Sequence, residues 1–138
     1  MIIETKNISM SALYRLYTSG GLIFGESDNS CMRGSYAEGP WHRKAIDAML
    51  DRQFFRKIFF YKDACGHLVC LGCNTHNQDV ITAIIMFIGD GMKSTSGRAY
   101  RTLNANELPM TKCPMLEYVY AADCGQDELG NFMEYASL

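Results

Sequence analysis

The stretch that decides the fold, residues 79–103, reads DVITAIIMFIGDGMKSTSGRAYRTL. Its segment 80–88 is almost continuously apolar and rich in β-branched residues, which favours a strand buried on both faces over a helix. A glycine-rich triplet at residues 89–91 ends that strand. The apolar spacing over residues 97–103 then predicts a short helix. The stretch therefore predicts a strand, a loop of small residues and a helix.

A connection of this kind can hold an anion in its loop. The backbone N–H groups of the loop and the positive end of the helix dipole point at the same place. Most such connections bind nothing, so an ordinary turn remains the alternative. A Walker loop is excluded because Met92 precedes the lysine. The residues that we expect to hold a phosphate or pyrophosphate are Lys93, Ser94, Thr95, Ser96, Gly97 and Arg98.

Length and composition predict a single domain, residues 1–138, with a hydrophobic core. The chain is 48% hydrophobic and 20% charged, as globular proteins usually are. Its net charge of −2 argues against a general nucleic-acid-binding surface. No apolar run of about eighteen residues predicts a membrane span, and no signal peptide is visible. We therefore expect a cytoplasmic protein whose six cysteines are reduced thiols.

The remaining patterns predict an α+β fold with a mixed, mostly antiparallel sheet flanked by helices. Short turns join the strands of a hairpin to segment 80–88, so these three strands should be antiparallel. Segments 80–88 and 115–121 flank a helix, so they should be parallel. In chain order we expect a strand at 1–4, a helix capped by Asn7 or Ser9, a long loop at 22–39, a helix from Pro40, hairpin strands at 57–62 and 67–73, a strand at 115–121 and a helix from Asp127.

This order of elements resembles the GNAT family of acyl-CoA-dependent N-acyltransferases, and its layout is similar to GNAT-like proteins of T7-like phages. The resemblance implies that acetyl-CoA or another acyl-CoA is held by the backbone of residues 93–98. It also implies that an amine substrate attacks the thioester while a weak base removes its proton. The segments that carry the resemblance are MIIETKNISMSALYRLY (1–17), FFYKDACGHLVCLGC (59–73), MKSTSGRAYRTL (92–103) and EYVYAADCGQDELGNFMEYASL (117–138).

The pyrophosphate signature of the family departs from its pattern here. The family has arginine or glutamine, two residues, glycine, one residue, then glycine or alanine. In this chain Gly97 matches, but Met92 and Thr95 replace the first two signature residues. A side chain at position 95 would crowd the approach of a pyrophosphate to the backbone.

The end of the chain also departs from the family. The tyrosine that the family often uses as general acid falls on Met133, unless the register slips and Tyr135 takes that role. The chain ends at Leu138, so we expect the family's last two strands to be absent. An open sheet edge would result, which favours a homodimer.

These departures support a second hypothesis from a different class. The protein would be a non-enzymatic binding or inhibitor protein of phage or mobile-element origin on the same degenerate fold. Its partner would be a protein, and the long loop at 22–39 would be the contact surface.

Cysteine and histidine residues suggest a zinc site, although we expect no metal. Cys65, Cys70, Cys73 and His76 are spaced as zinc ligands can be. However, Cys70 and Cys73 would point to opposite faces of a regular strand. Buried cysteines acting as small hydrophobes are the plainer interpretation.

A thiol nucleophile is the last alternative. Cys31 with His42, His67 or His76 has the residue types of a nucleophile and its base. Cys31 lies in a polar loop, away from a helix start that would lower its pKa. The plainer interpretation is a free loop thiol.

Overall fold

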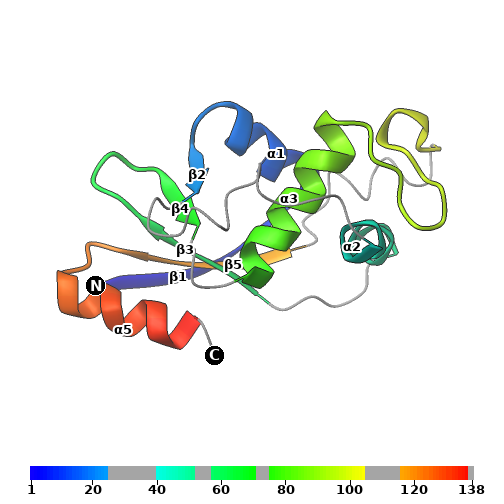
Figure 1. Cartoon of the computed structure of the whole chain (residues 1–138). Coiled ribbons are helices and arrows are strands. Elements are labelled where there is room, and N and C mark those ends of the chain that lie inside the picture. Colours follow the sequence, from blue (N-terminus) through cyan, green and yellow to red (C-terminus); the bar gives the residue numbers. More distant parts are fainter. Residues whose placement is uncertain (25–39, 52–56, 71–74, 105–115, 137–138) are drawn as a thin grey trace.

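The computed structural model describes residues 1–24, 40–51, 57–70, 75–104 and 116–136. Within them, five strands form one sheet in the order β1-β5-β3-β4-β2, with helices packed on both of its faces (Figure 1). The strands are β1 (Ile2–Ile8), β2 (Leu22–Phe24), β3 (Ile58–Lys62), β4 (Leu68–Cys70) and β5 (Leu116–Ala122). The helices are α1 (Met10–Thr18), α2 (Pro40–Leu50), α3 (Thr75–Gly89) and α5 (Gln126–Ala136), with a 3-10 turn η3 (Tyr100–Thr102).

The α+β class and the mixed sheet flanked by helices are confirmed. β1 pairs antiparallel with β5, and β3 pairs antiparallel with β4. β5 runs parallel to β3, and β2 runs parallel to β4. The described sheet is thus evenly mixed, whereas a mostly antiparallel sheet was expected, because segment 80–88 contributes no strand to it.

The prediction of a strand at 80–88 is wrong, since this segment lies inside α3. Every residue from Val80 to Phe87 is buried. A helix that is buried on all sides has no polar stripe, so its sequence is as uniformly apolar as that of a central strand. α3 packs against α1, α2 and β3, which together surround it with apolar side chains.

Asn77, in the first turns of α3, fastens this helix to the sheet. Its side-chain oxygen accepts from the backbone N–H of Phe59 at 2.9 Å, and its amide donates to the carbonyl of Phe59 at 2.9 Å. The buried amide therefore takes the place of a peptide group of a neighbouring strand. It satisfies the backbone N–H and carbonyl of Phe59, which lies beyond the residues of β3 that pair with β4. The short turn that we expected between the hairpin and segment 80–88 is thus replaced by the start of α3 at Thr75.

The predicted helix at 97–103 is also corrected, because only η3 forms there. Gly97 has a φ of +88°, a backbone conformation that a right-handed helix does not contain. The turn closes on itself through bonds from Ser94 N to Arg98 O (2.8 Å) and from Gly97 N to Ser94 O (2.9 Å).

The core is divided by the sheet into a large and a small cluster. Side chains alternate along β5, so that Tyr118 and Tyr120 face the large cluster while Val119 and Ala121 face the small one. Helices α1, α2 and α3 contribute to the large cluster, and α5 covers the other face through Phe132.

Several local predictions are confirmed. Ser9 caps α1, with its hydroxyl oxygen accepting from the N–H of Ala12 at 3.1 Å, so it is the cap rather than Asn7. α2 begins at Pro40, and the β3–β4 hairpin forms. β1 extends to Ile8, beyond the predicted 1–4, and β2 forms at the start of the predicted loop 22–39. Residues 25–39 of that loop lie outside the described residues. No helix among the described residues combines the length and apolarity that a membrane crossing requires.

Candidate functional site

The loop of residues 93–98, which was expected to hold a pyrophosphate, lies against α2. The Arg43 guanidinium of α2 donates to the carbonyl of Lys93 at 2.9 Å, and the N–H of Thr95 donates to the carbonyl of Arg43 at 3.4 Å. Both contacts join segments about fifty residues apart in sequence. The loop is therefore held in place by α2 and not by a preceding strand.

The carboxylate of Asp47, on α2, accepts hydrogen bonds from Ser96 and Arg98 of the loop. Ser96 donates to it from its N–H (2.9 Å) and from its hydroxyl (2.5 Å). Arg98 donates to Asp47 Oδ1 from Nε (3.1 Å) and Nη2 (2.6 Å). Arg98 also donates to the two carboxylate oxygens of Asp51, at 2.9 and 3.2 Å. Two carboxylates of the chain itself thus occupy the Arg98 guanidinium and the donors of Ser96. The N–H groups of Ser94, Thr95 and Gly97 donate to backbone carbonyls, and that of Arg98 donates to the Ser94 hydroxyl.

This arrangement shifts the ionisation of both partners. Burial alone would raise the pKa of Asp47, but the hydrogen bonds from Ser96 and Arg98 outweigh it and lower that pKa to about 2. The bonds to Asp51 and Asp47 raise the pKa of Arg98 above its usual value. The side chains of Asp47 and Arg98 are only 18% and 20% exposed, so solvent screens this pair incompletely. The cluster is a fixed, charge-paired joint between α2 and the loop.

The remaining predicted loop residues have different environments. Ser94 is buried, with its hydroxyl 3.2 Å from that of Ser96 and accepting from the N–H of Arg98 at 3.0 Å. Lys93 and Thr95 are exposed. A Cβ atom at Gly97 would meet nothing within 4 Å, so its positive φ, rather than close packing, calls for glycine there. Acyl-CoA binding by this loop stays a prediction. The strand predicted before the loop and the helix predicted after it do not form.

Tyr135, the candidate general acid, is not brought to this loop. It lies on α5 with 61% of its surface exposed, and its ring is 5.8 Å from that of Phe59. α5 covers the face of the sheet opposite to α3, whose carboxyl end leads into residues 93–98 (Figure 1). The sheet thus separates the predicted cofactor loop from the predicted catalytic side chain.

A hollow of about 340 Å³ lies beside the loop, between the end of α3 and η3. Gly91, with a φ of +76°, turns the chain at its edge. The residues that line the hollow are Phe87, Ile88, Gly89, Asp90, Gly91, Ala99, Tyr100 and Arg101.

The cysteine and histidine alternatives are only partly within the described residues. Cys31 and Cys73 lie outside them. Cys70 is buried in the core, as expected of a small hydrophobe, whereas Cys65 is exposed in the β3–β4 turn. His42 is buried, with its Nε2 3.7 Å from a carboxylate oxygen of Asp79.

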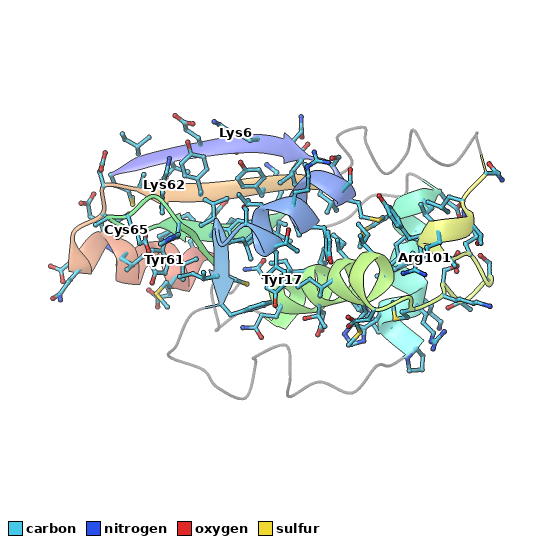
Figure 2. All side chains as sticks on the ribbon, turned by 90° about the horizontal axis from the view of Figure 1, so that it is seen from above. Lys6, Tyr17, Tyr61, Lys62, Cys65 and Arg101 are labelled. Carbon is cyan, nitrogen blue, oxygen red and sulfur yellow. The ribbon has the colours of Figure 1, made fainter. Side chains whose placement is uncertain are left out.

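A group of polar side chains on one face of the sheet was not predicted from the sequence. Tyr120 donates its hydroxyl to Glu4 at 2.5 Å, and the ammonium groups of Lys6 and Lys62 lie 5.6 and 5.7 Å from its ring centre. The two lysines are labelled in Figure 2. The bond to Glu4, together with burial, raises the pKa of Tyr120. These residues come from three strands that are distant in sequence. The only sequence signal for the group was therefore that Glu4 and Lys6, two residues apart, share one face of a strand.

The outer edge of β1 is open in the part of the chain that the structure describes. β1 ends the sheet, and its neighbour there is β5. Six of its seven residues are exposed, among them Ile2 (47%) and Ile3 (51%). Exposed apolar side chains on an unprotected edge strand are typical of a surface that pairs with another strand.

Comparison with models of protein families, with curated proteins and with solved structures found no match to this chain.

Proposed function

We propose that the protein is a non-enzymatic binding protein that assembles by adding a polypeptide strand to the open edge of β1, and that this strand is β1 of a second copy. The observation that supports the proposal is the exposed edge of β1, on which Ile2 and Ile3 are 47% and 51% exposed. Addition of a strand to such an edge gains main-chain hydrogen bonds along its length, and side chains on alternate positions select the partner.

The sequence of β1 is complementary to itself when two copies pair antiparallel about Thr5. In that register Glu4 of each copy stands opposite Lys6 of the other. Ile2 then stands opposite Ile8. Opposite charges and apolar pairs at directly facing positions stabilise antiparallel strands. A two-fold axis through the Thr5 pair also makes the interface closed, so assembly stops at a dimer.

The acyl-CoA hypothesis has less support than the binding hypothesis. Asp47 and Asp51 engage Ser96 and the Arg98 guanidinium, and the N–H groups of Ser94, Thr95, Gly97 and Arg98 bond to other groups of the chain. An acyl-CoA pyrophosphate would therefore have to displace two carboxylates that are already well bonded. Calorimetric titration with acetyl-CoA separates the two functions, because the binding hypothesis expects no heat of binding and the acyltransferase hypothesis expects saturable binding that Gly97→Glu weakens.

The assembly is tested by size-exclusion chromatography with light scattering over a range of protein concentrations. We expect wild type to have the mass of a dimer and Lys6→Glu to be a monomer, since four carboxylates would then meet across the edge. The double variant Glu4→Lys/Lys6→Glu restores the opposite charges and should dimerise again. Lys44→Glu changes the same charge at an exposed position of α2 and should leave the dimer intact.

Two results would reject the proposal. One is a wild-type protein that remains a monomer at the highest concentration it tolerates. The other is a dimer that Lys6→Glu and Lys44→Glu weaken equally, because the charge of the edge would then play no part in the contact.

A further inference from the structure

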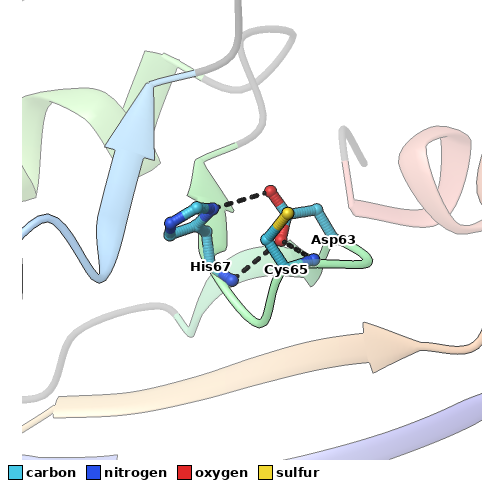
Figure 3. A group of neighbouring side chains, drawn as sticks. All are labelled: Asp63, Cys65 and His67. Carbon is cyan, nitrogen blue, oxygen red and sulfur yellow. Dashed lines mark hydrogen bonds and ion pairs between the residues drawn. The ribbon is translucent and has the colours of Figure 1, made fainter.

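The turn that joins β3 to β4 carries three side chains that commonly bind metals. Asp63, Cys65 and His67 alternate along it, and one ligand atom from each lies within 4.8 Å of the others (Figure 3). All three atoms belong to one short segment. Their spacing therefore depends on the local turn and not on the packing of distant elements.

Hydrogen bonds within the turn hold these side chains in place. Asp63 Oδ1 accepts from the backbone N–H of Cys65 at 3.0 Å and from that of His67 at 2.8 Å. The backbone closes through Asp63 N to His67 O (3.1 Å) and Gly66 N to Asp63 O (3.1 Å). Gly66, with a φ of +86°, makes the tight return possible. One carboxylate oxygen is thus committed to the turn, and the other is directed at the histidine.

The distances approach those of a tetrahedral metal site. Asp63 Oδ2 lies 3.0 Å from His67 Nδ1. With zinc bonds of about 2.0 Å to nitrogen and oxygen and about 2.3 Å to sulfur, ligand atoms stand about 3.3 to 3.6 Å apart. The Cys65 sulfur lies within 4.8 Å of both atoms and is exposed, and binding requires its side chain to move closer to them. His67 and Asp63 are 40% and 28% exposed, and solvent ions can therefore reach them.

We propose that this turn binds a divalent transition metal of the zinc type through Asp63 Oδ2, the Cys65 thiolate and His67 Nδ1, with water completing the coordination. A thiolate and an imidazole select zinc, cobalt or similar ions over magnesium and calcium, which prefer oxygen ligands. Three protein ligands and one open position also form the pattern in which a bound ion stays accessible to small molecules.

Binding changes the protonation of two of the ligands. The metal takes the lone pair of His67 Nδ1, so the neutral ring carries its proton on Nε2 in the bound state. The Cys65 thiol gives its proton to solvent. The Asp63 carboxylate needs no further change, because one of its oxygens accepts from the backbone N–H groups of Cys65 and His67 and the other is the proposed ligand.

This set of ligands differs from the cluster considered in the sequence, which joined Cys65 to Cys70, Cys73 and His76. Cys70 is buried in the core and is not a member of the group in the turn. The aspartate was not counted as a ligand. The alternation of Asp63, Cys65 and His67 across one turn was the signal that could have identified the site.

Cobalt titration of the purified full-length protein, freed of metal with a chelator and kept reduced, tests the proposal. We expect one Co²⁺ per chain and a thiolate-to-cobalt charge-transfer band that Zn²⁺ abolishes. Cys65→Ser should lose the band. Cys124→Ser removes a partly buried thiol elsewhere and should keep it. His67→Gln should weaken Co²⁺ binding about tenfold or more.

Other outcomes would overturn the site. Wild type without a saturable cobalt band, or Cys65→Ser with an undiminished one, shows that this turn binds no such metal. Urea unfolding of Cys65→Ser and His67→Gln confirms that both variants are folded, and we expect this because both side chains are exposed in a surface turn. The proposal is independent of dimerisation through β1.

Discussion

Two turns of this protein are each organised around one aspartate, yet they differ in what the carboxylate has left to bind. In the loop of residues 93–98, Asp47 accepts four hydrogen bonds from Ser96 and Arg98. In the turn of residues 63–67, one oxygen of Asp63 accepts two backbone N–H groups while the other faces His67 and lies near the Cys65 thiol. The first carboxylate joins two distant segments, whereas the second orients ligand groups toward solvent.

The comparison shows that a cluster of donors does not by itself indicate a ligand site. The donors of residues 93–98 have the composition of an anion site, but an anion from α2 is already bound to them. The turn of residues 63–67 contains fewer polar groups, yet its thiol is exposed, and its imidazole and second carboxylate oxygen are bonded to each other and partly exposed. The two turns differ in how accessible their polar side chains remain to a ligand once the hydrogen bonds within the protein have formed.

The largest expected effect on stability comes from removing the Asp47 carboxylate, which connects α2 to the loop of residues 93–98. Asp47→Ala should lower the free energy of unfolding by about 2 to 3 kcal/mol, because Ser96 loses its acceptor and Arg98 keeps only one carboxylate. Asp51→Ala should cost less than about 1 kcal/mol, since the Asp51 side chain is 50% exposed. Urea denaturation of both variants measures the difference. Equal losses would show that Asp47 is no more important than a surface ion pair.

The pH dependence of stability should identify the same carboxylate. The folded pKa of Asp47 is about 2 and its ordinary value is 3.8. Its contribution is therefore complete above pH 3.8 and is lost as the pH falls toward 2. The shift corresponds to about 2 kcal/mol. Unfolding free energies measured across this window should fall more steeply for wild type than for Asp47→Asn, and parallel curves would contradict the assignment.

A smaller and equal effect is expected from one glycine in each turn. Gly66 and Gly97 have φ values of +86° and +88°, and a Cβ atom at either would meet nothing within 4 Å. Alanine at either position should cost about 1 kcal/mol of unfolding free energy through backbone conformation alone. If thermal or urea unfolding shows a much larger loss for Gly97→Ala, the Asp47 joint depends on the local backbone more than its side-chain bonds indicate.

The smallest effect on stability should come from the exposed turn. His67→Gln leaves the Asp63 bonds to the backbone N–H groups in place, so the urea midpoint of the metal-free protein should stay unchanged. Added Zn²⁺ should then raise the midpoint of wild type and not that of the variant. A midpoint that falls in the variant without metal would assign His67 a structural role instead.

Patterns that depend on near neighbours were predicted well. Ser9 caps α1, Pro40 begins α2, and the β3–β4 hairpin has the expected turn. In each case the physical cause lies within a few residues of the feature.

Patterns that depend on distant neighbours were predicted poorly. An apolar run such as residues 80–88 is compatible with a central strand or with a helix that is buried all round, and only its surroundings select between them. The loop donors had the same ambiguity, since nothing near residues 93–98 in the sequence indicates that Asp47 would approach them. Sheet order was equally inaccessible, because β5 inserts between β1 and β3 from the far end of the chain.

The sequence by itself determined the α+β class, the starts of α1 and α2, the hairpin and the presence of Asp63, Cys65 and His67 on one turn. Local hydrogen bonding and side-chain alternation are sufficient to specify these features. Only the tertiary structure decided that 80–88 is helical, that Asp47 occupies the donors of the following loop and that β1 stands at an open edge. Each of these depends on which segments meet in space, and the stabilisation gained from such contacts is not encoded in any single stretch of residues.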